Sequence, residues 1–207
     1  MIIVAISGGT GSGKTTLAKK IIKNYSKLKV NYLSLDYYYK DYSDISFNKR
    51  SKINFDHPNS IDFKLFYQQI SKHIKGYDIK TPTYSYKRHK RLKKTLLIKQ
   101  GDLLILDGIL ILLKNNIRDF FDLSIFLDVS SSKRLERRIS RDKRERGRSI
   151  AEVEERFLKM IKPMHKKYVE PSKNFADIIL NEDYDFELIK NKIDQKLYGN
   201  NQKNKRF

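Results

Sequence analysis

The residues whose types and spacing most clearly indicate chemistry form a glycine-rich segment near the N-terminus. This segment, Gly-Gly-Thr-Gly-Ser-Gly-Lys-Thr, matches the pattern G-x-x-x-x-G-K-[ST]. Its glycines allow successive backbone N–H groups to surround a phosphate, and the helix expected after it adds partial positive charge. We predict that the segment binds a nucleoside triphosphate; a plain flexible turn is the alternative. The predicted triphosphate ligands are Gly8, Gly9, Thr10, Gly11, Ser12, Gly13, Lys14, Thr15 and Thr16.

Two acids that follow apolar runs, Asp36 and Asp107, are candidates for a magnesium site beside the triphosphate. The carboxyl ends of parallel strands meet at one edge of a sheet, where ligands bind. We expect Lys14 to contact the β- and γ-phosphates. Thr15, Asp36 and Asp107 are expected to hold Mg²⁺. The alternatives are a turn-forming aspartate at Asp36 and a helix-capping aspartate at Asp107.

An arginine-rich segment, 133–148, is the third candidate for chemistry. Its arginines recur every three or four residues, so several of them share one face of a predicted helix. One interpretation is a lid whose arginines cover the bound triphosphate and stabilise charge on the transferred group. The alternative is a solvated helix on which three acids form weak surface ion pairs with the arginines. The three acids are Glu136, Asp142 and Glu145.

The composition indicates one soluble domain. A length of 207 residues suits one packed core, and no glycine/serine-rich or proline-rich linker divides the chain. Cysteine is absent, which excludes disulfides and zinc–thiolate sites and is compatible with a reducing cytoplasm. No apolar run approaches the roughly 18 residues of a membrane span. We expect a cytoplasmic protein with no membrane segment.

The net charge of +20 raises the question of nucleic acid. The basic residues are spread along the whole chain, together with many Asn, Ile and Tyr residues. An A/T-rich coding sequence also produces this composition, so we do not expect nucleic acid as a partner. An ATP-dependent nucleic-acid-binding protein remains the alternative from a different class. It predicts association with DNA or RNA that weakens with salt.

The order of elements predicts an α/β fold, a P-loop NTPase-like parallel sheet flanked by helices. Buried strands are expected to begin at Ile2, Asn31, Leu103, Leu123 and Ala176, with helical patterns between them. This alternation favours right-handed crossovers and helices on both faces of the sheet. The single domain is expected over 1–198.

Two segments are expected outside this sheet. A small β-hairpin excursion is predicted over about 79–98, with short strands at 79–84 and 95–98 around the basic run 87–94. The charges of that run are either a solvated face or part of a substrate site. The polar, basic tail, 199–207, is expected to be disordered.

Several short motifs, taken in order, resemble the uridine kinase family. The similarity runs from Ile2 to about Leu180. A P-loop alone is shared by many unrelated enzymes, whereas Asn-Phe-Asp-His-Pro followed by Arg-Asp-x-x-x-Arg-Gly-Arg is far more specific. The motifs that carry the resemblance are 8–16, 34–39, 54–58, 82–84, His89, 107–110, 138–148, 162–165 and 170–172.

The resemblance implies an activity: transfer of a phosphoryl group from ATP or GTP, with Mg²⁺, to the 5′-hydroxyl of uridine and cytidine. The products would be UMP and CMP, in pyrimidine salvage. It also implies a homotetramer in which the hairpin helps to close the substrate site. The sequence leaves open whether ATP or GTP is the donor.

The resemblance also implies a role for each matching position. Asp36 would orient the 5′-hydroxyl and accept its proton. Lys14, with the lid arginines Arg141 and Arg146, would stabilise charge around the γ-phosphate. Asp56 and Arg138 would hold the ribose hydroxyls, and the base would lie against the remaining ligands. The implied nucleoside ligands are Tyr39, Asp56, Tyr84, His89, Arg138, Arg148 and Arg156.

Two positions depart from the family pattern. Asp107 stands where the family usually has glutamate, one methylene longer, so Mg²⁺ would be held through an extra water. Arg156 stands where a family glutamine contacts the pyrimidine. An amide both donates and accepts hydrogen bonds, whereas a guanidinium only donates. The preference between uridine and cytidine is therefore open.

Two further alternatives stay within this fold. One is another small-molecule kinase of the same branch, similar to phosphoribulokinase or pantothenate kinase. Asn54 to Pro58, together with Tyr84 and His89, argues instead for a nucleoside. The other is a protein that keeps the fold and has lost turnover, which only the departures at Asp107 and Arg156 favour.

Overall fold

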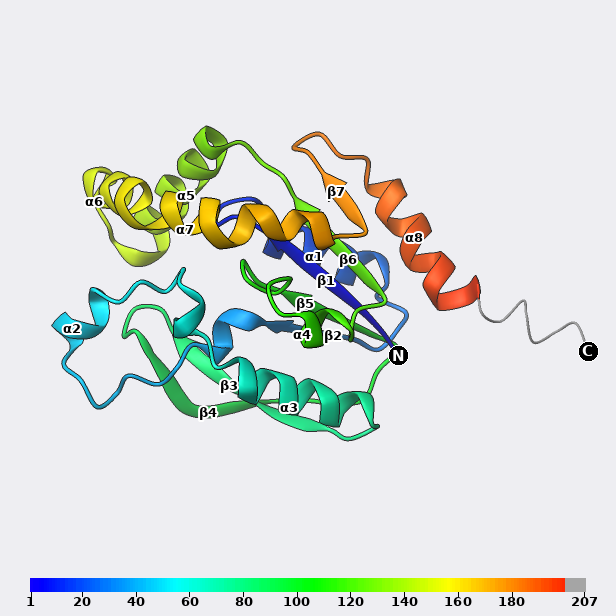
Figure 1. Cartoon of the computed structure of the whole chain (residues 1–207). Coiled ribbons are helices and arrows are strands. Elements are labelled where there is room, and N and C mark those ends of the chain that lie inside the picture. The colour runs from blue at the N-terminus through cyan, green and yellow to red at the C-terminus, as the bar shows by residue number, and fades with distance from the viewer. Residues whose placement is uncertain (200–207) are drawn as a thin grey trace, which may run out of the picture.

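Five parallel strands form the central sheet of this computed structural model, which describes residues 1–199 (Figure 1). Their order in the sheet is β2-β5-β1-β6-β7, so that β1, which leads into the glycine-rich loop, lies in the middle. The predicted α/β fold class is confirmed. The strands are β1 (Ile2–Gly8), β2 (Val30–Ser34), β5 (Leu103–Asp107), β6 (Leu123–Leu127) and β7 (Ile178–Leu180).

The two faces of the sheet carry separate hydrophobic clusters. In β1, Val4 and Ile6 belong to one cluster and Ile3 and Ala5 to the other, because successive side chains of a strand point to opposite faces. The first cluster packs against α1 (Lys14–Asn24) and α8 (Phe186–Tyr198). A sheet buried on both faces explains the continuous apolar runs of its strands.

The second face is covered by α3 (Phe63–Ile74) and the segment that follows β5. Phe66 and Ile70 of α3 are fully buried there. Asp62 caps α3 by accepting a hydrogen bond from the N–H of Leu65 at 3.0 Å. Gly76, with φ of 94°, follows the last turn of α3. The short α4 (Asn115–Arg118) lies between β5 and β6.

The predicted hairpin is present as β3 (Ile79–Ser85) and β4 (Lys90–Ile98), paired antiparallel. The prediction that the basic run 87–94 only connects two short strands was wrong, because β4 begins at Lys90 and pairs it with Ser85. Most side chains of β4 are exposed, so the lysines reach solvent while the backbone pairs. Charged residues are common on such exposed strands.

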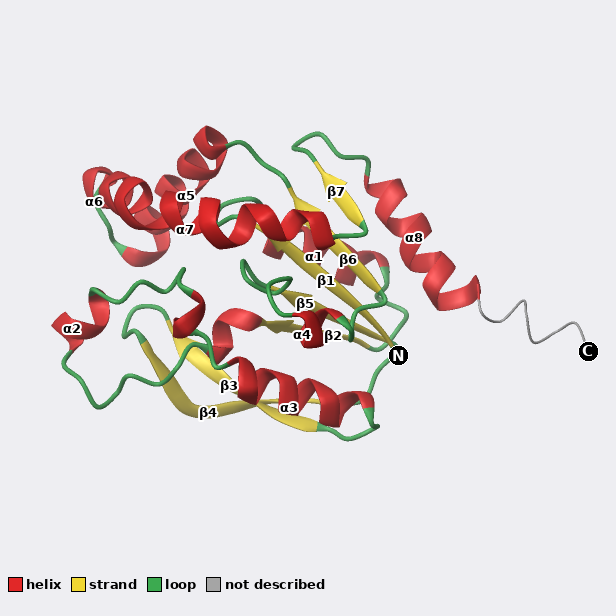
Figure 2. Ribbon diagram, viewed as in Figure 1, coloured by secondary structure: helices red, strands yellow, loops and turns green. Residues whose placement is uncertain are grey.

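A helical layer lies over the carboxyl end of the sheet (Figure 2). It consists of α5 (Ser131–Arg146), α6 (Ile150–Arg156) and their continuation to Phe175. The helical run is continuous, but it widens into π-helical turns at Phe157–Ile161 and His165–Val169. Between these turns α7 (Lys162–Met164) contains Pro163, which has no N–H to donate.

Opposite this layer, on the other side of the sheet's carboxyl edge, lie the hairpin and the irregular segment that follows β2 (Figure 1). That segment contains the 3₁₀ turn Leu35–Tyr38, the short α2 (Phe47–Ser51) and the 3₁₀ turn Pro58–Ser60. Residues 200–207, to which most of the predicted disordered tail belongs, lie outside the described residues.

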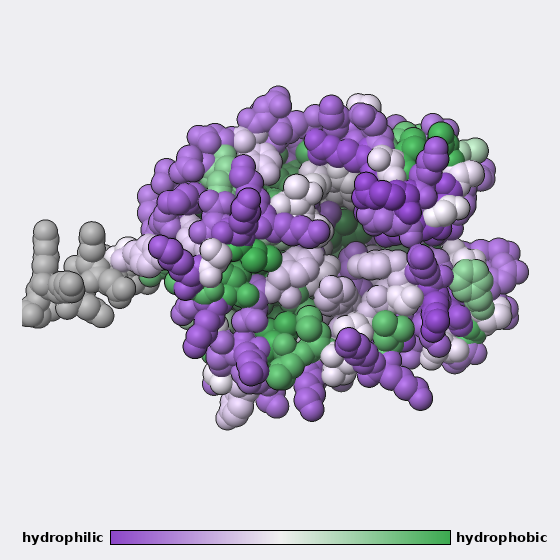
Figure 3. All heavy atoms as spheres, turned by 180° about the vertical axis from the view of Figure 1, so that it is seen from behind, coloured by the Kyte–Doolittle hydropathy of each residue, from purple (hydrophilic) through white to green (hydrophobic). Residues whose placement is uncertain are grey.

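No helix in the stretch 1–199 has the length and apolar character needed to cross a membrane. Hydrophilic residues cover most of the face that Figure 3 shows, with smaller hydrophobic areas between them.

Candidate active site

The glycine-rich loop connects β1 to α1, as the sequence predicts. Gly13, at the N-terminus of α1, has φ of 100° and Gly11 has φ of 80°, a region that residues with a Cβ rarely adopt. Lys14 folds back over the loop, and its Nζ donates hydrogen bonds to the carbonyl oxygens of Gly8 and Gly9, at 2.9 and 3.0 Å. Burial lowers the pKa of Lys14 to about 8, although Asp107 and Asp36 act in the opposite direction.

The glycine-rich loop also packs against α5. Arg134 is buried against the backbone of Gly9 and Gly11, and its Nε donates to the carbonyl oxygen of Val129 at 3.0 Å. This contact makes Arg134 a support for the loop. Ser12 of the loop is buried, and Thr16 is exposed on the first turn of α1.

The residues predicted to hold magnesium lie together at the carboxyl edge of the sheet. The hydroxyl of Thr15 donates to Asp107 Oδ2 at 3.0 Å, and Asp107 is buried. Asp36 lies two residues after the end of the strand β2, which neighbours β5, in the 3₁₀ turn. Asp107 therefore contacts the loop, and no helix N-terminus is capped by it among the described elements.

These oxygen ligands fit a magnesium ion of the kind that P-loop proteins bind. Mg²⁺ is usually held by a hydroxyl, one or two carboxylates, substrate phosphates and water. Within residues 1–199 no group of three or more His, Cys, Asp or Glu side chains forms a cage for a metal. The set of Thr15, Asp36 and Asp107 suits an ion that arrives with a triphosphate.

A pocket opens directly beside the loop and encloses about 700 Å³, its mouth included. The helical layer forms one wall, and the hairpin with the segment after β2 forms the other. Every predicted nucleoside ligand lines it, as do the predicted base and both lid arginines. The predicted residues on its wall are Thr10, Asp36, Tyr39, Asp56, Tyr84, His89, Arg138, Arg141, Arg146, Arg148 and Arg156.

Asp36 is the acid of the pocket that we expect to act as the base. Removal of its carboxylate from bulk water raises the pKa, and the nearby Asp107 raises it further, whereas Lys14 lowers it. Tyr86, in the turn that follows β3, donates a hydrogen bond from its hydroxyl to Asp36 Oδ2 at 3.4 Å. A carboxylate with a raised pKa is a better proton acceptor than an ordinary surface aspartate.

The end of the pocket away from the loop is aromatic. Phe55 and His89 stack with ring centroids 5.3 Å apart and planes 13° from parallel. Tyr39 packs edge to face against Phe55 and Tyr84, at 4.9 and 5.2 Å. The hydroxyl of Tyr84 is buried and finds no partner among residues 1–199. Such walls suit a flat heterocycle with polar edges.

His89 is held as a neutral ring. Burial, with Arg148 and Arg156 nearby, lowers its pKa to about 4. One nitrogen of a neutral imidazole accepts a hydrogen bond and the other donates. His89 has a positive φ of 49°, in the tight turn between β3 and β4 that brings its ring to the pocket.

Asp56 and Arg138 face the pocket between the loop and the aromatic end. Burial raises the pKa of Asp56, although Arg138 and Lys14 oppose the shift. Arg138 donates from Nη1 to the hydroxyl of Thr10 at 2.7 Å, which ties α5 to the phosphate loop. A carboxylate and a guanidinium side by side offer both an acceptor and donors to a diol.

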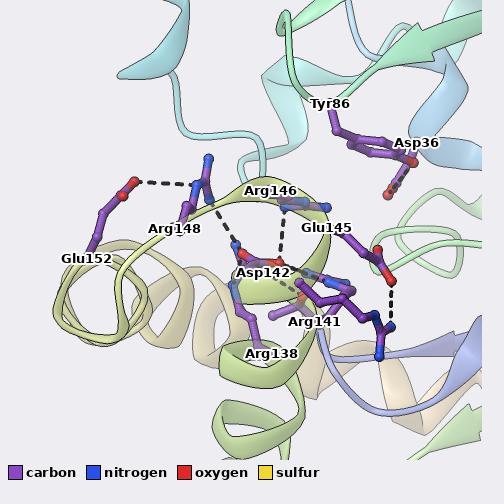
Figure 4. A network of polar contacts seen from close by, with 11 residues as sticks. Asp36, Tyr86, Arg138, Arg141, Asp142, Glu145, Arg146, Arg148 and Glu152 are labelled. Carbon is purple, nitrogen blue, oxygen red and sulfur yellow. Dashed lines mark hydrogen bonds and ion pairs between the residues drawn. The ribbon is translucent and has the colours of Figure 1, made fainter.

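Four arginines of the pocket surround one carboxylate, that of Asp142 in α5 (Figure 4). The interpretation of Asp142 as a partner in weak surface pairs was wrong, because its side chain is fully buried. That interpretation does fit Glu145, whose pair with Arg144 is exposed. We call the four arginines the arginine cluster; they are Arg138, Arg141, Arg146 and Arg148.

Arg156, the departure from the family pattern, lies in the pocket wall. Its Nη1 and Nη2 both donate to the carbonyl oxygen of Ser51, at 3.2 and 3.1 Å. This contact connects the helical layer to α2 across the mouth of the pocket. Arg156 thus does not turn outward to solvent, and its remaining donors are available to a ligand.

Sequence reasoning did not assign Phe55 or Asp142 a role in the site. Phe55 belongs to the motif Asn-Phe-Asp-His-Pro, and Asp142 belongs to Arg-Asp-x-x-x-Arg-Gly-Arg, so the sequence marks both positions. What the sequence lacks is the fold that packs Phe55 on His89 and buries Asp142.

Phosphoryl transfer requires almost no covalent chemistry from the protein and depends on charged groups positioned around the γ-phosphate. The loop with Lys14, the acids at two strand ends and the arginine cluster supply such charge around one pocket. The fold and the site together define a P-loop kinase.

The sequence comparisons give the family. The model of the Phosphoribulokinase / Uridine kinase family matches residues 3–187, and the chain belongs to this family. Uridine kinase of Macrococcus caseolyticus is 40% identical over 180 residues, which cover 87% of each chain. Uridine kinase of Clostridium novyi is 40% identical over 181 residues, again 87% of each chain.

Solved structures with low sequence identity share the fold. A possible uridine kinase from Bacillus stearothermophilus aligns with a TM-score of 0.61 at 16% identity, over 86% of this chain and 88% of that one. Phosphoribulokinase from Rhodobacter spheroides aligns with a TM-score of 0.65 at 15% identity, over 87% of this chain and 69% of that one. These likenesses support the architecture alone.

Proposed function

We propose that this chain is a uridine kinase, which transfers the γ-phosphoryl group of ATP or GTP to the 5′-hydroxyl of uridine and also of cytidine. The observation that carries the proposal is one pocket with a phosphate loop at one end and a stacked aromatic wall at the other. Asp36 and Asp56 lie between these ends. The relatives named uridine kinase, 40% identical over most of the chain, support it.

In the proposed reaction, the 5′-oxygen attacks the γ-phosphorus while its proton passes to Asp36. The bond from the γ-phosphorus to the bridging oxygen breaks, and the nucleoside diphosphate leaves. Lys14, Arg141 and Arg146 stabilise the negative charge on the transferred group and the leaving group. Thr15, Asp107 and Asp36 would hold Mg²⁺, which would neutralise phosphate charge.

Nucleoside recognition uses the rest of the pocket. Asp56 and Arg138 pair with the ribose hydroxyls, and a sugar without them leaves both groups unpaired, which is costly at a buried site. Phe55 and His89 form the wall for the base, and Tyr84 offers it a hydroxyl without another partner. Ribulose 5-phosphate or pantothenate has no ring to fill this wall, which argues against the rival kinases.

The test is a coupled kinase assay with Mg²⁺ and ATP, then GTP, on uridine, cytidine, adenosine, pantothenate and ribulose 5-phosphate. We expect turnover of uridine and cytidine alone. Turnover of pantothenate or ribulose 5-phosphate instead would replace this proposal with the corresponding rival. Silence with all five substrates would contradict it, and polymer-stimulated ATP hydrolysis in an RNA titration would then favour the nucleic-acid alternative.

The cytoplasmic location, the role in pyrimidine salvage and the homotetramer belong to the same proposal. Leu92, Leu96 and Leu97 are exposed apolar side chains on β4, and apolar surface of this kind suits contact between subunits. Multi-angle light scattering on the purified protein measures the assembly directly, and a monomeric mass would contradict the homotetramer.

A further inference from the structure

Asp142 is the one carboxylate that all members of the arginine cluster share. Its Oδ1 accepts hydrogen bonds from Nε of Arg141 at 2.9 Å and lies 3.5 Å from Nη1 of Arg146. Its Oδ2 accepts from Nη1 of Arg148 and lies beside Nε of Arg138, both at 3.5 Å. All four arginines line the pocket, whereas Asp142 lies behind its wall.

The backbone of Asp142 takes part in the same arrangement. Its carbonyl oxygen accepts hydrogen bonds from the N–H groups of Gly147 and, at 3.3 Å, of Arg148. Gly147, with φ of 67°, reverses the chain there and ends α5. This reversal brings Arg148 back to the side chain of Asp142, which also pairs with Arg138, Arg141 and Arg146 of α5.

The cluster also reaches the proposed base. The guanidinium of Arg146 lies 5.1 Å from the centre of the Tyr86 ring, and the hydroxyl of Tyr86 contacts Asp36 (Figure 4). A displacement of Arg146 would therefore change the surroundings of Asp36 as well as those of the phosphates.

Four guanidinium groups that face one pocket repel each other, and without a shared anion they would spread into solvent or into the substrate space. One buried carboxylate offsets part of this repulsion and leaves the wall with net positive charge for phosphates. Burial alone would raise the pKa of Asp142, but Arg138, Arg141 and Arg146 outweigh it and lower that pKa. Asp142 thus stays ionised near neutral pH.

We propose that Asp142 is a positioning residue for phosphoryl transfer, which acts through the arginine cluster without contact to either substrate. This inference rests on the proposed kinase function. In this proposal Asp142 holds Arg138, Arg141, Arg146 and Arg148 in position. Through Arg146 and Tyr86 it also contributes to the placement of Asp36.

The experiment compares Asp142→Asn, which removes the charge, and Asp142→Glu, which moves it by one methylene, with the wild type. We expect kcat for uridine to fall at least about tenfold in Asp142→Asn, with Asp142→Glu between that value and the wild type. ATP affinity, measured directly by calorimetry, is expected to stay equal or to tighten, because the loop is untouched and the wall gains positive charge. The matched control is Glu145→Gln on the same helix, expected to behave as the wild type.

Thermal unfolding identifies which variants are folded, and Asp142→Glu alone decides the question if Asp142→Asn does not fold. A folded Asp142→Asn variant with kcat within about twofold of the wild type would overturn the inference, and so would Asp142→Glu with such a kcat in the case that Asp142→Asn does not fold. So would a folded variant whose ATP affinity falls about tenfold, because the inference leaves the binding of ATP at the loop unchanged and places the effect on the rate of transfer. If the wild type itself does not phosphorylate uridine, the kinase proposal fails and the inference about Asp142 fails with it; if the wild type is active, the variants alone decide the role of Asp142.

Discussion

At the scale of single residues, the pocket pairs each expected chemical task with a side chain in a suitable environment. The carboxylate of Asp36 has a raised pKa, His89 is neutral, and Lys14 has a lowered pKa of about 8. These shifts have one common first cause, the removal of charged groups from water. They lead to a prediction on pH dependence.

We predict that kcat/KM for ATP rises and then falls with pH. Asp36 must be ionised to accept a proton, and its raised pKa moves the acid limb above the range of an ordinary aspartate. Lys14 must be protonated to stabilise phosphate charge, so the rate falls as pH rises past about 8. Steady-state rates across the stable pH range measure both limbs. A rate that stays level from about pH 8 to pH 10 would exclude Lys14 as the source of the alkaline limb.

Arg156 leads to a prediction on base preference. Its guanidinium donates only, which suits the O4 acceptor of uracil and opposes the amino group of cytosine. We therefore expect Arg156→Gln to raise the cytidine-to-uridine ratio of kcat/KM by about tenfold, the equivalent of one hydrogen bond. Competition assays with both nucleosides measure the ratio.

The control for this variant is Lys159→Gln, which removes an exposed cation from the same helical run. An unchanged ratio in Arg156→Gln would show that Arg156 serves only to hold Ser51. Thermal unfolding separates a change in specificity from a loss of the contact between the helical layer and α2.

At the scale of elements, the phosphate loop depends on α5 as well as on its own glycines. A Cβ at Gly11 would meet the carbonyl oxygen of Arg134, and φ of 80° there is strained for any residue with a side chain. We predict that Gly11→Ala lowers ATP affinity by about tenfold or more, since such strain costs about 1–3 kcal/mol. Calorimetric titration with ATP measures the loss.

Gly199→Ala is the matched control, because a Cβ there meets nothing within 4 Å and its φ of −64° is helical. It should bind ATP as the wild type does. Normal ATP affinity in Gly11→Ala would mean that the loop does not keep this conformation when it binds a nucleotide.

The elements also show what the sequence could and could not predict. The strands of the sheet and the phosphate loop follow from local patterns, because apolar runs and glycine spacing fix them within a few residues. The length of β4 could not be predicted, because its lysines are exposed and its structure comes from pairing with β3. Burial of Asp142 could not be predicted either, since helical spacing does not reveal which face meets other elements.

At the scale of the whole molecule, the site is divided among three parts of the fold. The phosphate loop and the magnesium ligands belong to the sheet and α1, the arginine cluster to the helical layer, and the aromatic wall to the hairpin and the segment after β2. Predicted ligands from residues 10 to 156 of the sequence meet in one pocket because parallel strands deliver their carboxyl ends to one edge.

This division explains why the candidate site could be predicted residue by residue but not as a geometry. The resemblance supplied positions such as Asp56 and Arg148, and the structure supplies the charge of Arg138 that acts on Asp56 and the contact of Arg148 with Asp142. The stacking of Phe55 on His89 needs the hairpin to reach the segment after β2, which no local pattern encodes.

The central claim, that Asp36 is the base of a nucleoside kinase in this pocket, is tested most directly by uridine phosphorylation in the wild type and in Asp36→Asn. We predict that the wild type forms uridine 5′-phosphate from ATP and uridine. In Asp36→Asn, kcat should fall at least about a hundredfold, the usual effect of losing a general base, while calorimetry still shows ATP binding. Near-normal turnover in Asp36→Asn would contradict the account and remove Asp36 from the mechanism.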